Sequence, residues 1–138
     1  MPKRRRGSRT AIRHGSPARH TRFETLVEDV LARIPAPFDR ALDEVAIVIE
    51  DEPSPIQRRD NHLAPDETLY GLYDGVPRTE WGADLAMVAN KISLFRLPLE
   101  EDFPDPADLA AEVRLTVLHE LAHHLGIDDD RLDALGLD

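Results

Sequence analysis

The segment HELAHHLGIDD at residues 119–129 carries the side chains whose types and spacing could do chemistry. On an α-helix, residues four apart lie on the same face, so His119 and His123 can direct ring nitrogens at one point. Two imidazoles at this spacing suit Zn²⁺. Glu120 is rotated by about 100 degrees from His119, which lets its carboxylate reach a water beside the metal rather than the metal itself. The pattern predicts a zinc site with Glu120 as the general base.

Gly126 can take the left-handed conformation that ends a helix, which allows the chain to turn back and present a third metal ligand. We predict that Asp129 is this ligand, and Asp128 or Asp130 could replace it if the turn differs. His124 has a suitable side chain for a metal ligand, but it is turned by about 100 degrees from His123 on the helix and so faces another direction. Three protein ligands would leave the fourth position for a water, whose pKa zinc lowers toward about 7.

Composition restricts the kind of protein that carries this motif. The chain has 138 residues, 41% of them hydrophobic, which suits one small domain with a modest core. It has no cysteine, so histidine and carboxylate remain as protein ligands for zinc, and a reducing cytoplasm fits. There is no apolar run long enough to span a bilayer and no secretory signal pattern, so we expect a cytoplasmic protein without a membrane partner.

Charge divides the chain into two parts. Residues 1–22 carry 8 basic and no acidic side chains, whereas residues 23–138 carry 9 basic and 27 acidic ones, a net charge of -18. The first part has almost no apolar residues, so we expect a disordered, solvated tail before a domain at residues 23–138. Such a tail could contact nucleic acid, an anionic surface or its own acidic domain, and we do not expect specific nucleic-acid binding.

Helical spacing of apolar residues from Phe23 to Ile34 predicts a first helix that Thr21 caps and that prolines 35 and 37 terminate. A β-branched run at residues 45–49 predicts a buried strand. Further strands are predicted at the ranges 69–73 and 91–97, and the range 53–66 is predicted to be a loop.

The motif itself needs a helix with clear ends. Asp105 can cap the first turn and Pro106 suits the first helical position, so the helix should begin there and run for about twenty residues to Gly126. Apolar side chains on the side away from the two ligand histidines would anchor it in the core. Nothing in the sequence identifies the group that would stabilise an oxyanion. Three possible donors, each more typical of a structural role, are Tyr70, Tyr73 and Arg96.

With these residues in place, the chain resembles the small bacterial zincin-like metallopeptidases, a family marked by a C-terminal HExxHxxGxxD motif. The resemblance covers most of residues 23–138 and none of the basic tail. It is weaker at the segments 45–53, 69–77 and 91–100. The residues that match the motif in spacing are His119, Glu120, His123, Gly126 and Asp129.

The resemblance implies an α+β, minimal zincin-like fold, in which a short mixed sheet packs against an N-terminal helix and a C-terminal active-site helix. It also implies bacterial origin, a peptide or protein substrate, and an edge strand, here Lys91–Leu97, that could pair with an extended peptide. The activity implied is zinc-dependent hydrolysis of peptide bonds, in which Glu120 takes the proton of the attacking water and passes it to the leaving amine.

One departure keeps other functions open. The larger metzincins place a methionine-containing turn after the third ligand, whereas Met87 precedes the motif here and cannot fill that position in the same order. One alternative is therefore a degenerate zincin that binds metal, peptides or a protein partner without cleaving them. Another is a nucleic-acid-associated regulator that acts through the tail. The substrate and the oligomeric state are not indicated by the sequence.

Overall fold

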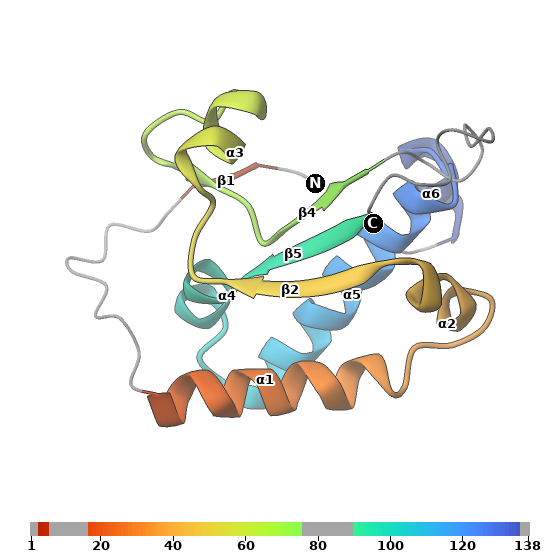
Figure 1. Cartoon of the computed structure of the whole chain (residues 1–138), viewed down its shortest axis with the longest axis horizontal. Helices are drawn as coiled ribbons and strands as arrows, with labels where there is room; N and C mark the ends of the chain where they lie inside the picture. The colour runs from red at the N-terminus through yellow and green to blue at the C-terminus, as the bar shows by residue number, and fades with distance from the viewer. Residues whose placement is uncertain (1–2, 6–16, 76–89, 136–138) are drawn as a thin grey trace.

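The computed structural model describes residues 3–5, 17–75 and 90–135. These residues form an α+β fold in which helices pack on a small mixed sheet (Figure 1), as predicted. None of the described helices is long and apolar enough to cross a membrane. The helices are α1 (Pro17–Leu31), α2 (Phe38–Ala41), the 3-10 helix η1 (Leu42–Glu44), α3 (Pro55–Asp60), α4 (Arg96–Asp102), α5 (Pro106–His124) and α6 (Asp129–Leu135). The strands are β1 (Arg4–Arg5), β2 (Ala46–Glu50), β3 (Glu67–Thr68), β4 (Gly71–Asp74) and β5 (Lys91–Phe95).

The main sheet has the strand order β2-β5-β4, with β2 parallel and β4 antiparallel to β5. The expectation that Lys91–Leu97 is an edge strand is therefore wrong, because β5 lies in the centre. Its burial gives the reason. Ile92 and Leu94 on one face and Ser93 and Phe95 on the other are all 0% exposed, which requires cover on both faces and neighbours on both sides.

β2 was predicted to be a buried strand and is less buried than predicted. It begins one residue later than predicted, at Ala46, which is exposed, and the rest of the strand is half-buried. A run of β-branched residues shows that a strand forms but does not show whether a neighbour lies on both sides. Among the strands that the structure describes, β2 has a neighbour on one side only, so it is an edge strand of this sheet.

The segment predicted as strand 69–73 forms β4 from Gly71 to Asp74, and the short strand β3 (Glu67–Thr68) lies just before it. Gly71 explains how β4 approaches the motif helix, since a Cβ added there would lie 2.6 Å from Thr116 Cγ2 on α5. β4 ends at Asp74, and the following Gly75 has a φ of 150°. Trp81 and Met87 lie outside the described residues.

Helices α3 and α4 occupy segments for which a loop and part of a strand were predicted. The expected loop at residues 53–66 contains α3, which begins with a capping box formed by Ser54 and Gln57 and has Pro55 in its first turn. The sequence contained this signal. The chain also turns into α4 directly after β5, so the predicted strand at 91–97 is two residues too long.

The N-terminal region is more ordered than predicted at two places. α1 begins at Pro17 rather than after Thr21, so the helix includes the last residues of the expected tail. Arg4 and Arg5 form β1, which pairs antiparallel with β3. The guanidinium of Arg4 also lies 5.0 Å from the ring centre of Tyr70. Residues 3–5 thus contact the acidic body, and their side chains stay exposed to solvent.

The motif helix α5 has the ends that the sequence predicted. Asp105 Oδ1 accepts hydrogen bonds from two first-turn amides, at 2.8 and 3.3 Å. At the other end Gly126 has a φ of +76°, and Ile127 N–H donates to Ala122 O at 2.8 Å. The side chains that anchor α5 and α1 in a common core beneath the sheet are Phe23, Val27, Val30, Val113, Val117, Leu118 and Leu121.

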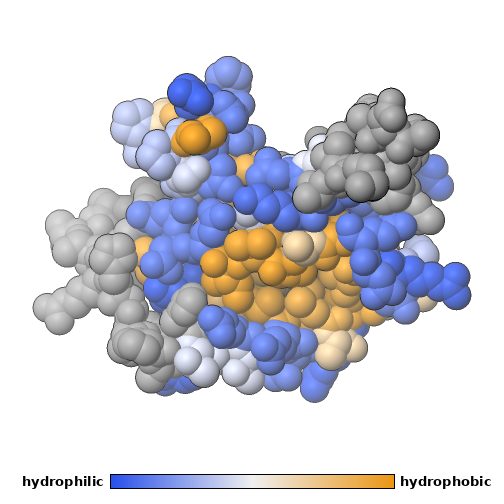
Figure 2. All heavy atoms as spheres, viewed as in Figure 1, coloured by the Kyte–Doolittle hydropathy of each residue, from blue (hydrophilic) through white to orange (hydrophobic). Residues whose placement is uncertain are grey.

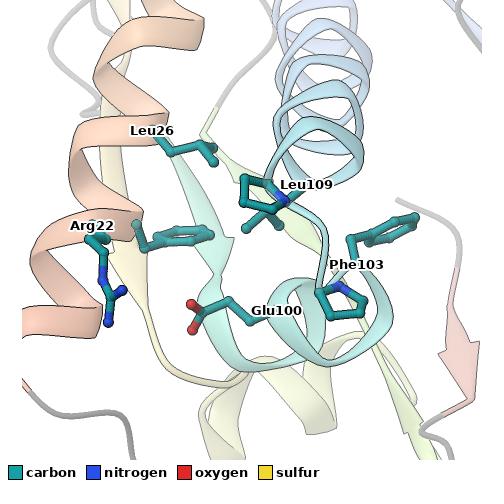
Figure 3. Close-up of a pocket in the computed structure, with 8 residues that line it drawn as sticks. Arg22, Leu26, Glu100, Phe103 and Leu109 are labelled. Atoms are coloured by element: carbon teal, nitrogen blue, oxygen red, sulfur yellow. The ribbon is translucent and has the colours of Figure 1, made fainter.

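A pocket of about 460 Å³ lies where α1 meets the turn between α4 and α5, with Leu26 and Leu109 projecting toward it (Figure 3). It is at the N-terminal end of α5. The motif histidine His119 is ten residues further along the helix, about 15 Å away along its axis. This pocket is therefore separate from the residues that could hold a metal.

Candidate metal centre

The last two turns of α5 bring the predicted chemical side chains together. Potential ligand atoms of His119, Glu120 and His123 all lie within 4.8 Å of one another. His119 is 7% exposed and Glu120 is 1% exposed, whereas His123 is half-buried. A small molecule would therefore reach the cluster from the side of His123.

The Glu120 carboxylate lies between the two imidazoles. Its Oε2 is 3.9 Å from His119 Nε2, and its Oε1 is 3.8 Å from His123 Nδ1. The backbone N–H of Tyr73 on β4 donates to Glu120 Oε1 at 3.0 Å. The carboxylate is thus held by a rigid strand and faces both potential metal ligands.

The hydrogen-bond pattern of the sheet explains why this backbone N–H is available. Phe95 N–H donates to Tyr70 O at 2.9 Å, so Tyr70 and Leu72 direct their backbone groups toward β5. Tyr73 belongs to the alternate set, whose N–H and C=O groups point away from β5. The side of β4 that faces away from β5 therefore borders the motif helix.

Sequence comparison agrees with this geometry. A model of the zincin-like metallopeptidase family matches residues 42–137, which include the main sheet and the whole motif. The chain belongs to this family. A solved structure of a conserved hypothetical protein from Thermo thermophilus is 30% identical, with 86% of this chain and 99% of that chain covered at a TM-score of 0.50. No curated protein sequence matches the chain.

The donor set of this zincin-like protein fits the metal that the family implies. Two imidazole nitrogens and a carboxylate are ligands or near neighbours that suit Zn²⁺, and the chain contains no thiolate that would favour a softer metal. His119 and Glu120 are also buried, so a cation there would lie in a setting of low dielectric constant beside a carboxylate.

The third predicted ligand, Asp129, is the first residue of α6, directly after the turn at Gly126. Its side chain lies outside the described part of the structure, so its role as a ligand stays a prediction. Of the two alternatives, Asp128 accepts a hydrogen bond from Arg131 N–H at 2.9 Å and so caps α6. Asp130 has an exposed side chain.

His124 has a role that sequence reasoning did not find. Its side chain is 0% exposed, with Nε2 2.8 Å from Glu44 Oε2 and Nδ1 2.8 Å from Tyr73 Oη. Both ring nitrogens are therefore engaged away from the cluster, and His124 is not a metal ligand here. The sequence did carry a signal for this role. His123 and His124 are adjacent on a helix and cannot face the same way, so only one of them can point at the metal and the other must have different partners.

The three possible oxyanion donors have structural partners. Tyr73 Oη is bonded to His124, and burial, followed by the nearby Glu44 charge, raises the pKa of Tyr73 to about 12. Tyr70 donates its hydroxyl hydrogen to Asp102. The third donor, the buried Arg96, donates to Asp51 Oδ1 at 2.9 Å and to Glu100 Oε1 at 2.5 Å.

Proposed function

We propose that this zincin-like protein is a zinc-dependent peptidase. The observation that carries the proposal is the convergence of His119, Glu120 and His123, with Glu120 oriented by the Tyr73 backbone N–H. His119, His123 and Asp129 are the residues that would hold the metal. When bound, Zn²⁺ supplies Lewis acidity, which polarises a peptide carbonyl and lowers the pKa of a water.

In this proposal Glu120 moves the protons. Its carboxylate accepts a proton from the water whose oxygen attacks the peptide carbon, and later delivers that proton to the leaving amine nitrogen. The products are then a carboxylic acid and an amine. Burial and the hydrogen bond to Tyr73 keep the carboxylate in one orientation, which limits the reorganisation that each proton transfer requires.

The strand that borders the cluster is β4, so an extended substrate would align along β4 rather than along the central strand β5. The acidic body, with its net charge of -18 over residues 23–138, favours basic or neutral polypeptides as substrates.

A second candidate is a protein that binds metal and peptide without hydrolysis. The observation in its favour is that Glu120 is 1% exposed and already accepts a hydrogen bond, so a water must enter beside it before it can act as a base. The two candidates share the metal site and differ in the proton transfer alone.

Glu120→Gln separates them, because it keeps the shape of the side chain and removes the base. We expect wild-type protein loaded with zinc to cleave members of a broad peptide library, and Glu120→Gln to be about 100-fold to 10,000-fold slower with zinc content retained. Glu112→Gln, the same substitution two turns earlier on α5, is the control and should be close to wild type. Equal cleavage by wild type and Glu120→Gln would contradict a peptidase.

A further inference from the structure

The edge strand β2 exposes backbone groups on the side away from β5. Ala46 N–H donates to Asn90 O at 3.0 Å, and the parallel register continues from there. Ala46 and every second residue after it therefore bond to β5, while Ile47 and Ile49 direct their N–H and C=O groups outward. No residue in the described ranges bonds these outward groups.

A groove lined by four apolar and two acidic residues runs beside this edge. The side chains of Ile47 and Ile49 lie next to α1, and the groove between them has a volume of about 320 Å³. In the space-filling view, an apolar patch is visible where β2 lies above α1 (Figure 2). The α1 residues that line the groove are the apolar Val27 and Leu31 and the acidic Glu24 and Glu28.

β2 lacks the features that usually keep an edge strand from pairing. Natural edges often carry a lysine, a proline or a bulge, and β2 has the sequence AIVIE with regular pairing to β5. Open backbone groups and an adjacent side-chain groove are the two elements that strand addition uses, the first for affinity and the second for side-chain selection.

The charges around β2 indicate what kind of strand could pair with it. Acidic residues lie at both ends of β2: Asp43 and Glu44 before it, Glu50 at its last position, and Asp51 and Glu52 after it. Of these, Glu44 is also bonded to His124 and Asp51 to Arg96. A second copy paired antiparallel about Val48 would place Glu44 opposite a glutamate of the other copy, and like charges directly opposite each other destabilise a sheet. A segment with lysine or arginine would instead be attracted to these flanks and to the α1 carboxylates.

We propose that the β2 edge is a docking site for an extended, basic segment of a partner protein, which adds as a fourth strand beside β2. Its backbone bonds the outward groups of Ile47 and Ile49. Its side chains on the face toward α1 include both apolar and basic ones, so that the apolar ones enter the groove and a basic one lies near Glu28. The site is distinct from the metal centre, because β5 separates β2 from β4.

The test uses the full chain and the synthetic heptapeptide Lys-Thr-Val-Thr-Val-Thr-Lys as the probe, because its valines and lysines project from the same face of an added strand. Amide hydrogen exchange followed by NMR reports on single backbone groups. In the protein alone, the Ala46 and Val48 amides should be protected and the Ile47 and Ile49 amides should exchange quickly. With the peptide, the Ile47 and Ile49 amides should become protected, whereas a peptide with glutamate in place of lysine should leave them unchanged.

A matched pair of charge reversals tests the role of the groove. Glu28 and Asp60 are both exposed, and each substitution by lysine changes the net charge by the same amount. Glu28→Lys should weaken binding of the basic peptide about fivefold, and Asp60→Lys should leave it unchanged. Equal weakening by both would show nonspecific attraction to an acidic protein and would overturn the proposal.

Three other outcomes would also overturn it. One is that the basic peptide leaves the Ile47 and Ile49 amides unprotected. Another is that both amides are already protected in the protein alone at every concentration, which would mean that the chain covers its own edge. The third is protection that rises with protein concentration, which would make a second copy the occupant.

Discussion

Tyr73 serves the candidate centre through two different parts of the residue. Its backbone N–H donates to the Glu120 carboxylate, and its hydroxyl is bonded to the ring of His124, which Glu44 holds from the other side. The buried His124 therefore fixes the strand residue that orients the proposed base. This coupling joins two adjacent turns of α5 to β4 without using a metal ligand.

The hydroxyl of Tyr73 can be removed without changing its backbone. We expect Tyr73→Phe to lower the free energy of unfolding by about 2 kcal/mol, because the buried Nδ1 of His124 loses its hydrogen-bond partner. Zinc content should be unchanged, since the cluster keeps its three side chains. Urea unfolding measures the first quantity and elemental analysis the second. Unchanged stability would show that the His124 network does not support the fold.

Tyr70 gives the fold a dependence on alkaline pH. Burial raises the pKa of Tyr70 well above its usual value near 10, and the hydrogen bond to Asp102 raises it further. Because the folded-state pKa is the higher one, the stabilisation is complete below pH 10 and is lost as the pH rises above it. Unfolding measured between pH 9 and pH 11 should show stability falling above about pH 10 in wild type.

In Tyr70→Phe the fall should be shallower, since the phenol that must stay neutral is gone. Tyr73 has a raised pKa too, so some dependence should persist in this variant. An identical slope in wild type and Tyr70→Phe would contradict the assignment of the effect to Tyr70.

At the scale of the element, the contact between β4 and α5 sets the geometry of the centre. Gly71 allows the close approach, and Thr116 is the α5 residue that a larger side chain would meet. Gly71 therefore allows β4 to lie close enough to α5 for the Tyr73 N–H to reach Glu120.

Gly71→Ala should destabilise the protein by about 1 to 3 kcal/mol, because the new methyl group would lie 2.6 Å from Thr116 Cγ2. Adding Thr116→Ala should restore part of the loss by removing the opposing methyl group. Thermal unfolding of the single and double variants measures both effects. Gly71→Ala with wild-type stability would mean that β4 and α5 are not in close contact.

The elements that the sequence predicted well are those with local signals at their ends. Helix α5 has a capping aspartate at residue 105 and Gly126 beyond its last turn, and both act as predicted. The capping box of α3 was an equally local signal that the prediction overlooked, since three prolines suggested a loop.

The position of a strand within the sheet depends on non-local contacts. Periodicity in one strand does not show which segment will lie beside it, so the central place of β5 and the edge position of β2 could not be predicted. The motif histidines and Glu120 followed from helical spacing alone. The link from His124 to Glu44 joins residues 80 positions apart and has no signature in the sequence.

Over the whole molecule, the N-terminal contacts, the metal centre and the proposed docking edge lie at three different strands. The basic N-terminus contacts the acidic body at β1, where Arg5 pairs with Asp66 at 3.0 Å and Lys3 Nζ donates to His62 O at 2.7 Å. These contacts are exposed, and their electrostatic part should weaken with salt. The metal centre borders β4, and the proposed docking edge is β2 on the other side of the sheet.

The central claim is that the end of α5 is a zinc site of a zincin-like protein. The most direct measurement is anomalous diffraction at the zinc edge from crystals of the full chain grown with zinc. The account predicts one strong peak bound by His119, His123 and Asp129 and adjacent to Glu120, and loss of that peak in His119→Ala. Absence of the peak from wild-type crystals, or a peak that persists in His119→Ala, would contradict it.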